Sequence, residues 1–398
     1  MRVLVGVSGG IAAYKSCELV SRLVQSGHEV RVILTPKAAE FVAPMTFRAL
    51  SGHPVSTSVV DEPEGALSHI ALSHWADALI IAPATASLMA RLATGLADDM
   101  LSLVYLGFRG HVIMAPAMEP DMWRHPRTQA NARILNDDGV VMVGPGEGRL
   151  ASGRIGPGRM AEPAEVLERL GDVTAPHDLS GLRMLITAGS TWEPFDPVRL
   201  LTNPSTGLMG VLIANQAARR GARVVLVKGP SVIAPAHAAV EQLGVTTALQ
   251  MAEAVHSRMP DVDIFVGAAA VSDFRPAEQL ARKAPKESLS LTWRMEPNPD
   301  IIRDVAQRYG GQKLIIGFAA QTEDAVRQAQ EKRQAKGLDA MVANVVGGRH
   351  GFGEAKHEAW LVTADGVDAM TGGTKQDTAE QLLDWISRRV QGDGGWNR

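Results

Sequence analysis

The chain has 398 residues, 45% of them hydrophobic, and a formal net charge of -3 at pH 7. This length exceeds that of one ordinary core, so we expect two domains. The near-neutral charge excludes the basic field of a nucleic-acid or anionic-membrane binder, and small molecules are the expected partners. The single cysteine, Cys17, excludes an intramolecular disulfide and a cysteine-based metal cluster, and it suits a reducing compartment.

The amino-terminal sequence MRVLVGVSGG enters a predicted strand directly and lacks the residue order of a signal peptide. No apolar run reaches the roughly 18 residues that a membrane-spanning helix needs. We therefore expect a cytoplasmic protein that does not associate with membranes.

The first part of the chain alternates predicted strands and helices. Residues 2–8 form a β-branched apolar run, and a glycine turn and apolar residues at helical spacing follow up to Gly27. Pro83 and Pro116 are each expected to end a strand, because proline cannot donate to a sheet. This alternation predicts a doubly wound parallel sheet. The other elements expected here are strands at 29–34, 78–81 and 112–115 and a helix at 87–93.

The turn SGGIAAYK follows the first predicted strand. The free N–H groups of Ser8, Gly9 and Gly10, before a helix, predict a phosphate seat. Thr35 and Thr85, each following a predicted strand, place further hydroxyls on the same edge. Because the turn lacks the GxGxxG spacing of dinucleotide-binding folds, a mononucleotide is the better expectation.

Residues 109–160 contain the segment in which we expect the chemistry. Glu119, Asp121 and Arg124 follow a predicted parallel strand, at the edge where open α/β sheets bind ligands. A glycine-rich segment from 144 to 158 is predicted to be a flexible flap. Its arginines at 149, 154 and 159 could close over an anion and exclude water. A solvated surface loop is the alternative.

A short polar segment with proline and glycine, 171–181, is predicted to be a linker, because the strand and glycine-turn pattern restarts after it. The expected domains are therefore 1–170 and 182–391, with a flexible tail at 392–398. Asp365-Gly366 predicts a hairpin turn within 357–371. The other elements expected in the second domain are helices at 208–220 and 299–308 and strands at 222–227, 262–268 and 313–318.

Several motifs resemble those of a known family. SGGIAAYK, SHIALSHWADALIIAPATA, PAMEPDMW and IGPGRM resemble the flavin-dependent cysteine decarboxylases. TAGSTWEPFDPVRLLTNPSTG, AAAVSDFRP, PNPDII, GFAAQT and KGLDAMVAN are similar to phosphopantothenate–cysteine ligases. Together, and in family order, they resemble the bifunctional decarboxylase and ligase of bacterial coenzyme A biosynthesis. The resemblance implies a flavodoxin-like, flavin cysteine decarboxylase-like first domain and a Rossmann-like second domain.

The implied reactions are CTP-dependent ligation of 4'-phosphopantothenate to cysteine through an acyl-cytidylate, and FMN-dependent oxidative decarboxylation of the product to 4'-phosphopantetheine. Loss of CO2 needs an electron sink beside the carboxylate, which oxidation of the thiol by a flavin supplies. His69 matches the family's active-site base; a helix-face histidine is the alternative. The implied assembly is a homo-oligomer with a trimer unit, which could build a dodecamer. The implied FMN contacts are Ser8, Gly9, Gly10, Ile11, Thr35, Pro83, Ala84 and Thr85.

Two residues of the first domain depart from the family pattern. Glu119 stands where the family usually has Asn, and an ionised Glu accepts hydrogen bonds only, so it must carry a proton to bind the substrate carboxylate. Ser152 stands where many members have a catalytic Cys, and a hydroxyl is a poorer proton donor than a thiol. We expect a decarboxylase of a variant subclass, in which Glu119 or water donates the final proton.

The ligase motifs imply a second site. Gly189, Ser190 and Thr191 form a candidate phosphate cradle. Asp273 follows a buried strand, where it could bind Mg2+ brought with CTP, or a ribose. The other implied residues are Arg199 and Asn203 for the acyl-nucleotide, Lys283 and Lys286 for phosphate charge, and Phe318 beside the base. A solvated charge cluster is the alternative for the two lysines.

The second domain also departs from the family pattern. Leu208, Gln321 and Val345 stand where the family has Lys, Glu and Asp. These changes leave the rate and the choice of nucleotide open. Three rival functions are a catalytically inactive flavin-binding regulator, a flavin prenyltransferase and a peptide-cysteine decarboxylase; the ligase motifs argue against each of them.

Overall fold

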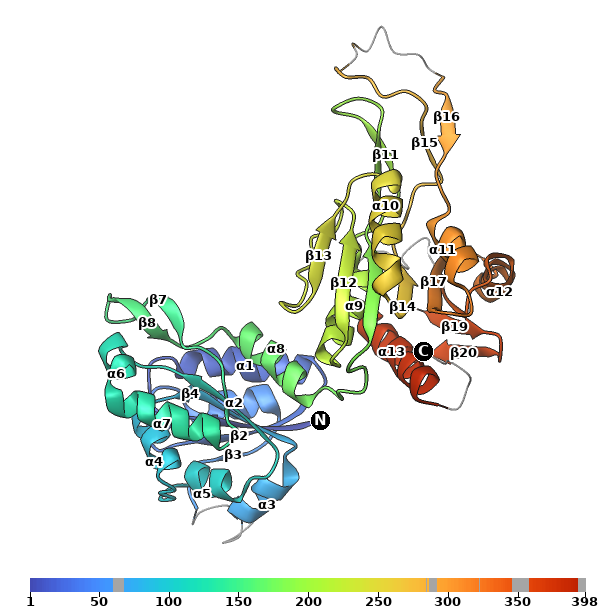
Figure 1. The fold of residues 1–398 in the computed structure, drawn as a ribbon. Coiled ribbons are helices and arrows are strands. Elements are labelled where there is room, and N and C mark those ends of the chain that lie inside the picture. The colour runs from blue at the N-terminus through green and yellow to red at the C-terminus, as the bar shows by residue number, and fades with distance from the viewer. Residues whose placement is uncertain (60–67, 284, 286–291, 322, 346–357, 393–398) are drawn as a thin grey trace. The chain divides into compact units, whose positions relative to one another are not determined.

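The computed structural model describes residues 1–59, 68–283, 285, 292–321, 323–345 and 358–392 (Figure 1). The chain divides into two compact units, Met1–Ala175 and Pro176–Arg398. The division falls inside the segment predicted to be a linker. Parts of that segment belong to the two units rather than to a linker. Helix α8 (Pro163–Thr174) extends into it, and the buried Leu179 is part of the core of the second unit.

The first unit is built on one six-stranded parallel sheet with the order β3-β2-β1-β4-β5-β6. Flavodoxin-like sheets run 2-1-3-4-5, so this sheet shares their doubly wound character but has the strand order of dinucleotide-binding folds. The strands are β1 (Arg2–Val7), β2 (Glu29–Leu34), β3 (Val55–Ser56), β4 (Ala78–Ala84), β5 (His111–Pro116) and β6 (Val141–Met142).

Helices cover both faces of this sheet. Val3 and Val5 pack on the face covered by α1 and α8, whereas Leu4 and Leu79 pack on the face covered by α4 and α5. Burial on both faces explains why the strands are apolar throughout rather than alternating. The remaining elements are α1 (Ala13–Gln25), a 3-10 turn (Ala38–Glu40), α2 (Pro44–Ser51), α3 (Ser68–Trp75), α4 (Ala86–Ala93), α5 (Met100–Gly107), α6 (Pro120–Arg124) and α7 (Pro126–Asp137).

Two sequence-based expectations for this unit were wrong. Pro83 and Pro116 lie inside the ends of β4 and β5, where a register shift between Ile81 and Ala84 accommodates them. The glycine-rich segment is not an irregular loop, because it forms an antiparallel ribbon of β7 (Gly146–Arg149) and β8 (Ile155–Arg159).

The second unit contains an eight-stranded sheet with the order β13-β12-β9-β14-β17-β18-β19-β20. Its first six strands, numbered along the unit, repeat the order 3-2-1-4-5-6, which confirms the Rossmann-like prediction. The predicted hairpin is also confirmed, since β19 and β20 are antiparallel. The strands are β9 (Arg183–Ala188), β12 (Arg223–Lys228), β13 (Glu241–Gly244), β14 (Ile264–Gly267), β17 (Leu314–Gln321), β18 (Ala340–Val345), β19 (Ala359–Thr363) and β20 (Val367–Met370).

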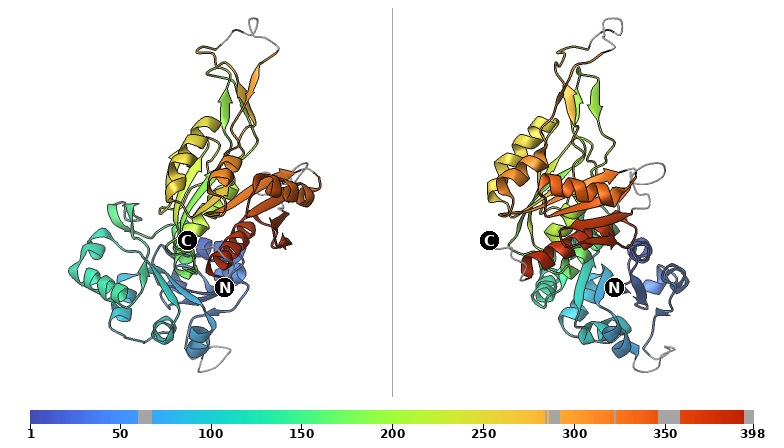
Figure 2. Two further views of the ribbon diagram at one scale, coloured as in Figure 1. Left: turned by 45° about the vertical axis from the view of Figure 1, so that its right-hand side comes forward. Right: turned by 90° about the vertical axis from the view of Figure 1, so that its right-hand side faces the viewer.

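Two short antiparallel ribbons extend this unit beyond the end of its sheet, as Figures 1 and 2 show. One pairs β10 (Trp192–Pro194) with β11 (Leu200–Thr202), and the other pairs β15 (Phe274–Pro276) with β16 (Met295–Pro297). The helices are α9 (Leu208–Arg219), α10 (Ala248–Arg258), α11 (Ile301–Tyr309), α12 (Ala325–Lys336) and α13 (Lys375–Gln391), with a 3-10 turn at Met259–Asp261. Within the described ranges, no helix is both long enough and apolar enough to cross a membrane.

A buried arginine ties the start of the second unit to its last helix. Arg220 is only 5% exposed. Its guanidinium donates to both carboxylate oxygens of Asp178, at 2.8 and 2.5 Å, and to Asp384 on α13 at 2.7 Å. The hydrogen bond from Arg220 lowers the pKa of Asp178.

Replacing this arginine tests its contribution to stability. We expect Arg220→Met to lower the free energy of unfolding of the second unit by about 2 kcal/mol, less than for fully buried pairs because both carboxylates are partly exposed. Urea unfolding, monitored by hydrogen exchange of the amides in α9 and α13, measures this loss in the free energy of unfolding. Because the pKa of Asp178 is lowered on folding, the contribution is complete above about pH 4 and is lost as the pH falls further. Arg327→Ala, at an exposed pair with Asp324, serves as the control.

Candidate active sites

Ser8, which directly follows β1, joins the turns at the carboxyl ends of β1 and β4. Its hydroxyl donates to the carbonyl oxygen of Pro83 at 2.7 Å and accepts the N–H of Thr85 at 3.0 Å. The helices after these two strands cover opposite faces of the sheet, since α1 packs in one core and α4 in the other. Ligands of doubly wound sheets bind in the crevice at such a switch point. The structure therefore brings Ser8, Pro83, Ala84 and Thr85 together at one sheet edge.

The glycine turn after β1 is closely packed on one side. A Cβ atom at Gly9 would lie 2.4 Å from Cβ of Lys37, whereas one at Gly10 would lie 3.5 Å from Cγ2 of Thr85. Ile11 is 61% exposed at the start of the following helix. Thr35 is buried, and its hydroxyl accepts the N–H of Ala38, so that hydroxyl caps the 3-10 turn.

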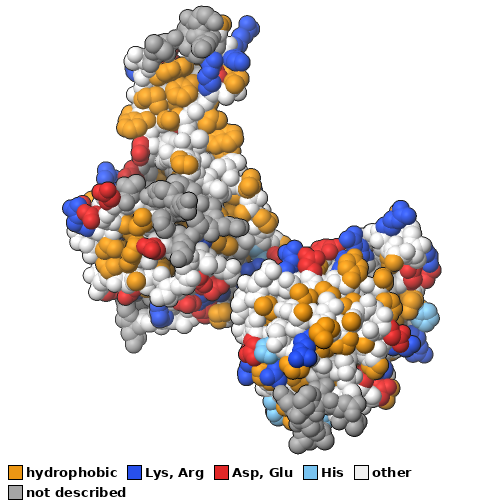
Figure 3. All heavy atoms as spheres, turned by 180° about the vertical axis from the view of Figure 1, so that it is seen from behind, with side chains coloured by type: hydrophobic (Ala, Val, Ile, Leu, Met, Phe, Trp, Pro, Cys, Tyr) orange, Lys and Arg blue, Asp and Glu red, His pale blue; other side chains and the backbone are white. Residues whose placement is uncertain are grey.

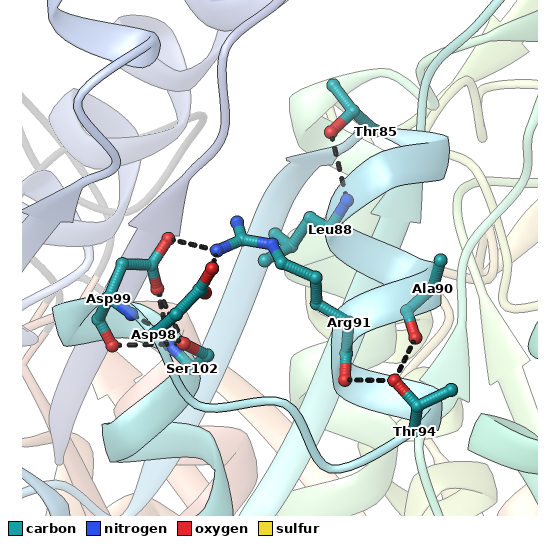
Figure 4. A network of polar contacts seen from close by, with 8 residues as sticks. All are labelled: Thr85, Leu88, Ala90, Arg91, Thr94, Asp98, Asp99 and Ser102. Carbon is teal, nitrogen blue, oxygen red and sulfur yellow. Dashed lines mark hydrogen bonds and ion pairs between the residues drawn. The ribbon is translucent and has the colours of Figure 1, made fainter.

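Polar contacts anchor the other side of this edge (Figure 4). Thr85 caps α4 by accepting the N–H of Leu88 at 3.4 Å. Arg91, on the same helix, pairs with Asp98 at 2.5 Å and with Asp99 at 2.8 Å. Asp99 in turn caps α5 through the N–H of Ser102. Helix α4 is thus held at its first turn by Thr85 and at its last turn by the ion pairs of Arg91.

The β7–β8 ribbon packs on the segment after β5. The N–H of Met118 donates to the carbonyl oxygen of Gly158 at 3.0 Å. Gly158 has a φ of 141°, and a Cβ atom there would lie 2.1 Å from the carbonyl oxygen of Met118, so only glycine fits. Ser152 is exposed in the connection between the two strands. The segment predicted to be a flexible flap therefore forms a ribbon that packs on the Met118–Glu119 backbone.

His69 and Glu119 each carry a buried polar atom that lacks a partner. His69 lies on α3, and Glu119 immediately precedes α6. Nδ1 of His69 and Oε2 of Glu119 make no hydrogen bond to any described residue. Buried polar groups are normally satisfied, so both atoms are candidates for contact with a ligand or water. Among the described residues, no hydrogen bond joins His69, Glu119 and Ser152 to one another.

Lys15 is a buried cation that sequence reasoning missed. It is 7% exposed on α1, and its Nζ donates to the carbonyl oxygen of Met160 at 3.1 Å and to Glu162 at 2.9 Å. The hydrogen bond from Lys15 lowers the pKa of Glu162. Lys15 thereby joins the helix after the glycine turn to the chain just beyond β8. The position of Lys15 on the apolar face of α1 could have indicated from the sequence that this lysine is buried.

The close approach at Gly9 can be tested by mutation. We expect Gly9→Ala to displace the turn, because its methyl group would overlap Lys37, and to lower the amount of flavin that co-purifies. The ratio of visible flavin absorbance to protein absorbance measures this loss. Gly10→Ala is the matched control, since its methyl group would make an ordinary contact, and it should keep the thermal stability of the unmodified protein. Full flavin content in Gly9→Ala would contradict the assignment.

In the second unit, the Gly189-Ser190-Thr191 turn is buried and already bonded within the protein. The N–H of Ser190 donates to Oγ of Ser231 at 2.8 Å, and its hydroxyl accepts from Thr202 at 3.0 Å. Thr191 accepts the N–H of Ser272 at 3.1 Å. Because these polar groups are occupied, the turn forms a rigid floor more readily than a phosphate cradle.

Glycines allow close approaches around this floor. A Cβ atom at Gly229 would lie 2.1 Å from the carbonyl oxygen of Ser190, and one at Gly207 would lie 2.8 Å from the N atom of Gly189. Gly207 precedes α9 with a φ of 70° and no side-chain cap, so the first N–H groups of α9 lack a capping side chain. A helix terminus of this kind binds phosphate. The sequence predicted both the glycine turn and a helix from residue 208, but not that this helix start lies beside the turn.

Asn203 lies beside the chain that follows β14. Its amide donates to the carbonyl oxygen of Val271 at 3.1 Å, and Asn298 donates to the carbonyl oxygen of Ser272 at 2.9 Å. Asp273 comes next and is exposed. No cluster of three His, Cys, Asp or Glu side chains that could hold a metal occurs in the described part of the chain. A cation at Asp273 would thus depend on ligand oxygens as well.

The remaining predicted residues of this unit are dispersed. Arg199 pairs with the buried Asp196 at 2.9 Å in the β10–β11 ribbon. Phe318 is half-buried on β17, Lys283 is exposed, and Lys286 lies outside the described residues.

Gln321 and Val345, the two acidic positions that changed, are direct partners across β17 and β18. The Nε2 atom of Gln321 is buried and makes no hydrogen bond to a described residue.

The floor of the second site can be tested through Gly229. We expect Gly229→Ala to push the Ser190 backbone away and to raise the KM for the nucleotide at least about tenfold, since small displacements of binding groups are costly. Steady-state kinetics of nucleotide consumption measures this change. Gly244→Ala adds the same methyl group in open space and should leave the kinetics unchanged. Equal behaviour of the two variants would rule out the proposed floor.

Two family models match the chain, one in each unit. Residues 1–174 match the model described as Flavoprotein. Residues 179–390 match the model described as DNA/pantothenate metabolism flavoprotein C-terminal domain. The two matches together span both compact units.

Curated relatives match over almost the whole chain. The Coenzyme A biosynthesis bifunctional protein CoaBC of Escherichia coli K12 is 42% identical over 394 residues, which cover 98% of this chain and 97% of the relative. CoaBC of Mycolicibacterium smegmatis is 40% identical over 414 residues and 99% of each chain.

Two solved structures are similar to one part of the chain each. The C-terminal domain of a CoaBC is 31% identical, with a TM-score of 0.46, and covers 55% of this chain and 100% of its own. The FMN-dependent cysteine decarboxylase SpaF is 31% identical, with a TM-score of 0.38, and covers 43% of this chain and 97% of its own.

Proposed function

This chain belongs to the CoaBC family of bifunctional coenzyme A biosynthesis proteins, and from that membership we propose the two reactions that its units carry out. The second unit ligates 4'-phosphopantothenate to cysteine with CTP through an acyl-cytidylate. The first unit decarboxylates the product to 4'-phosphopantetheine with FMN. The observation that carries this proposal is the 42% identity over 98% of the chain, which spans both units. We also propose that the enzyme is cytoplasmic.

The residues of the first unit fit a flavin. The Flavoprotein model covers this unit, and the strand order of its sheet has a topological switch point between β1 and β4, where doubly wound sheets bind ligands. We propose that FMN is held there by the turns Ser8–Ile11 and Pro83–Thr85, with Thr35 on the adjoining turn. When bound, the flavin would supply the two-electron oxidation of the thiol that lets the carboxylate leave as CO2, and it would return the same two electrons to the decarboxylated product.

His69 and Glu119 have the free capacity that this reaction requires. The buried Nδ1 of His69 can take the proton of the substrate thiol, because it makes no hydrogen bond to a described residue and a neutral imidazole nitrogen accepts a proton. Oε2 of Glu119 is buried and makes no hydrogen bond to a described residue, so a water beside it, or Glu119 once it has taken up a proton, can return a proton to the product. The β7–β8 ribbon covers this segment and limits access of water. Ser152, in the ribbon connection, adds a hydroxyl in place of the family's thiol.

The ligase unit must activate a carboxylate before cysteine attacks it. We propose that CTP binds over the Gly189–Thr191 floor, with its phosphates at the start of α9 and its base near Phe318. Asn203 and Arg199 then orient the acyl-nucleotide, and Lys283 and Lys286 neutralise phosphate charge. Asp273 would bind Mg2+ jointly with the triphosphate, as is usual for a cation that retains several non-protein ligands.

A homo-oligomer with a trimer unit, extending to a dodecamer, remains part of this proposal. Large hydrophobic side chains are exposed close to the flavin turn: Ile11 and Tyr14 at 61%, Phe41 at 49% and Met45 at 67%. Hydrophobic side chains also gather on the face of the first unit that Figure 3 shows. Exposed apolar groups of this kind support contact with further copies.

An inactive flavin-binding regulator is not favoured. The curated relatives described above match both units and are bifunctional biosynthetic proteins. A pure binding role would also leave the second unit without a purpose.

Replacement of His69 separates the two reactions. We expect His69→Asn to reduce CO2 release by at least about 100-fold, because the thiol base is lost, while CTP-dependent ligation and flavin content stay unchanged. Product analysis with 4'-phosphopantothenate, cysteine and CTP measures both steps. His111→Asn, an exposed change at the amino end of β5, is the control. Unimpaired decarboxylation by His69→Asn would exclude the assigned base.

A further inference from the structure

The β7–β8 ribbon is held against the segment Met118–Asp121 by three kinds of contact. A backbone hydrogen bond joins Met118 to Gly158, and a Cβ atom at Gly156 would lie 3.2 Å from Pro120. At the tip, Nη1 of Arg154 donates to Oδ2 of Asp121 at 2.7 Å. This ion pair is the charged contact between the tip of the ribbon and α6.

Arg154 and Arg159 of the ribbon form ion pairs with carboxylates in different places. Arg159 pairs with Glu162 at 2.6 Å, on the side where Lys15 also binds that carboxylate. Arg154 instead lies beside the active-site segment, because Asp121 is two residues after Glu119. The pKa of Arg154 is raised, first by its hydrogen bond to Asp121 and to a smaller extent by the charge of Glu119.

The substrate carboxylate requires a hydrogen-bond donor at this place. An ionised Glu119 only accepts hydrogen bonds, so it cannot supply what an asparagine amide would supply. A guanidinium has five N–H groups in a planar fork, which matches a carboxylate. Among the described residues, the Arg154 guanidinium has one hydrogen-bonded partner, Asp121, so most of its donors remain for a ligand.

We propose that Arg154 recognises the substrate carboxylate in the decarboxylase unit and that Asp121 is its positioning residue. This proposal rests on the proposed function of the first unit. Asp121 holds Nη1, and the remaining edge of the guanidinium forms a bidentate pair with the carboxylate. The cation of Arg154 also offsets the repulsion between that carboxylate and Glu119. The donor function that Glu119 lost is thus supplied from the ribbon.

A comparison of two ligands isolates carboxylate recognition. 4'-Phosphopantothenoylcysteine carries the carboxylate, and 4'-phosphopantetheine is the same molecule without it. We expect Arg154→Gln in the flavin-loaded full chain to raise the KM of the first about 10- to 100-fold, the usual cost of losing a charged hydrogen bond. The Kd of the second, from calorimetry, should stay within about twofold. Arg127→Gln, an exposed arginine in the first turn of α7, removes the same charge from the same unit and should change neither value.

The partner residues give a second, independent readout. In an Glu119→Asn background the amide restores a donor, so we expect Arg154→Gln to cost at least about threefold less there than in the unmodified protein. Asp121→Asn should weaken substrate binding without weakening product binding.

Equal weakening of both ligands by Arg154→Gln would show a merely structural role and overturn the proposal, as would no effect on either. If the unmodified protein bound neither ligand, the proposed function itself would fail, which distinguishes the two cases.

Discussion

The hydrogen bonds of Ser8 to the turn after β4 are the constraint on which the first site depends. These bonds join the carboxyl ends of β1 and β4, and the helices that follow the two strands, α1 and α4, lie on opposite faces of the sheet. The switch point between β1 and β4 is a consequence of the strand order, and the turns beside it are held together by contacts between residues far apart in the sequence. A ligand phosphate placed there meets an edge that is already formed, so little ordering is required on binding.

The first six strands of the main sheet in the second unit have the same order as the sheet of the first unit. The loops at the carboxyl edges of the two sheets differ. The polar groups of the first glycine turn in the second unit are hydrogen-bonded to Ser231, Thr202 and Ser272. Gly229 and Gly207 allow the neighbouring chain to approach this turn closely. A buried turn of this kind leaves ligand binding to the groups around it, above all the start of α9. Two sheets with one topology therefore support two chemistries because the loops at their carboxyl edges differ.

Much of the fold could be predicted from sequence because the central strands, such as Arg2–Val7 and Arg183–Ala188, are short apolar runs followed by a turn. The strand at Glu29–Leu34 was confirmed with its predicted limits, and the hairpin that turns at Asp365-Gly366 was confirmed with slightly shorter strands than predicted. The geometry of the site was harder to predict from the sequence, because it depends on pairs of residues far apart in the chain, such as Lys15 with Glu162 and Arg154 with Asp121. Glycine content indicated a loop at 144–158, but pairing of β7 with β8 depends on contacts with Met118 that no local pattern reveals.

The central claim is that one chain carries out both reactions in sequence. The most direct measurement follows 4'-phosphopantothenate, cysteine and CTP with the flavin-loaded protein and quantifies CTP cleaved, CO2 released and 4'-phosphopantetheine formed. The account predicts equal amounts of all three, despite Glu119 and Ser152. Consumption of CTP with accumulation of the acyl-cysteine and no CO2 would contradict it.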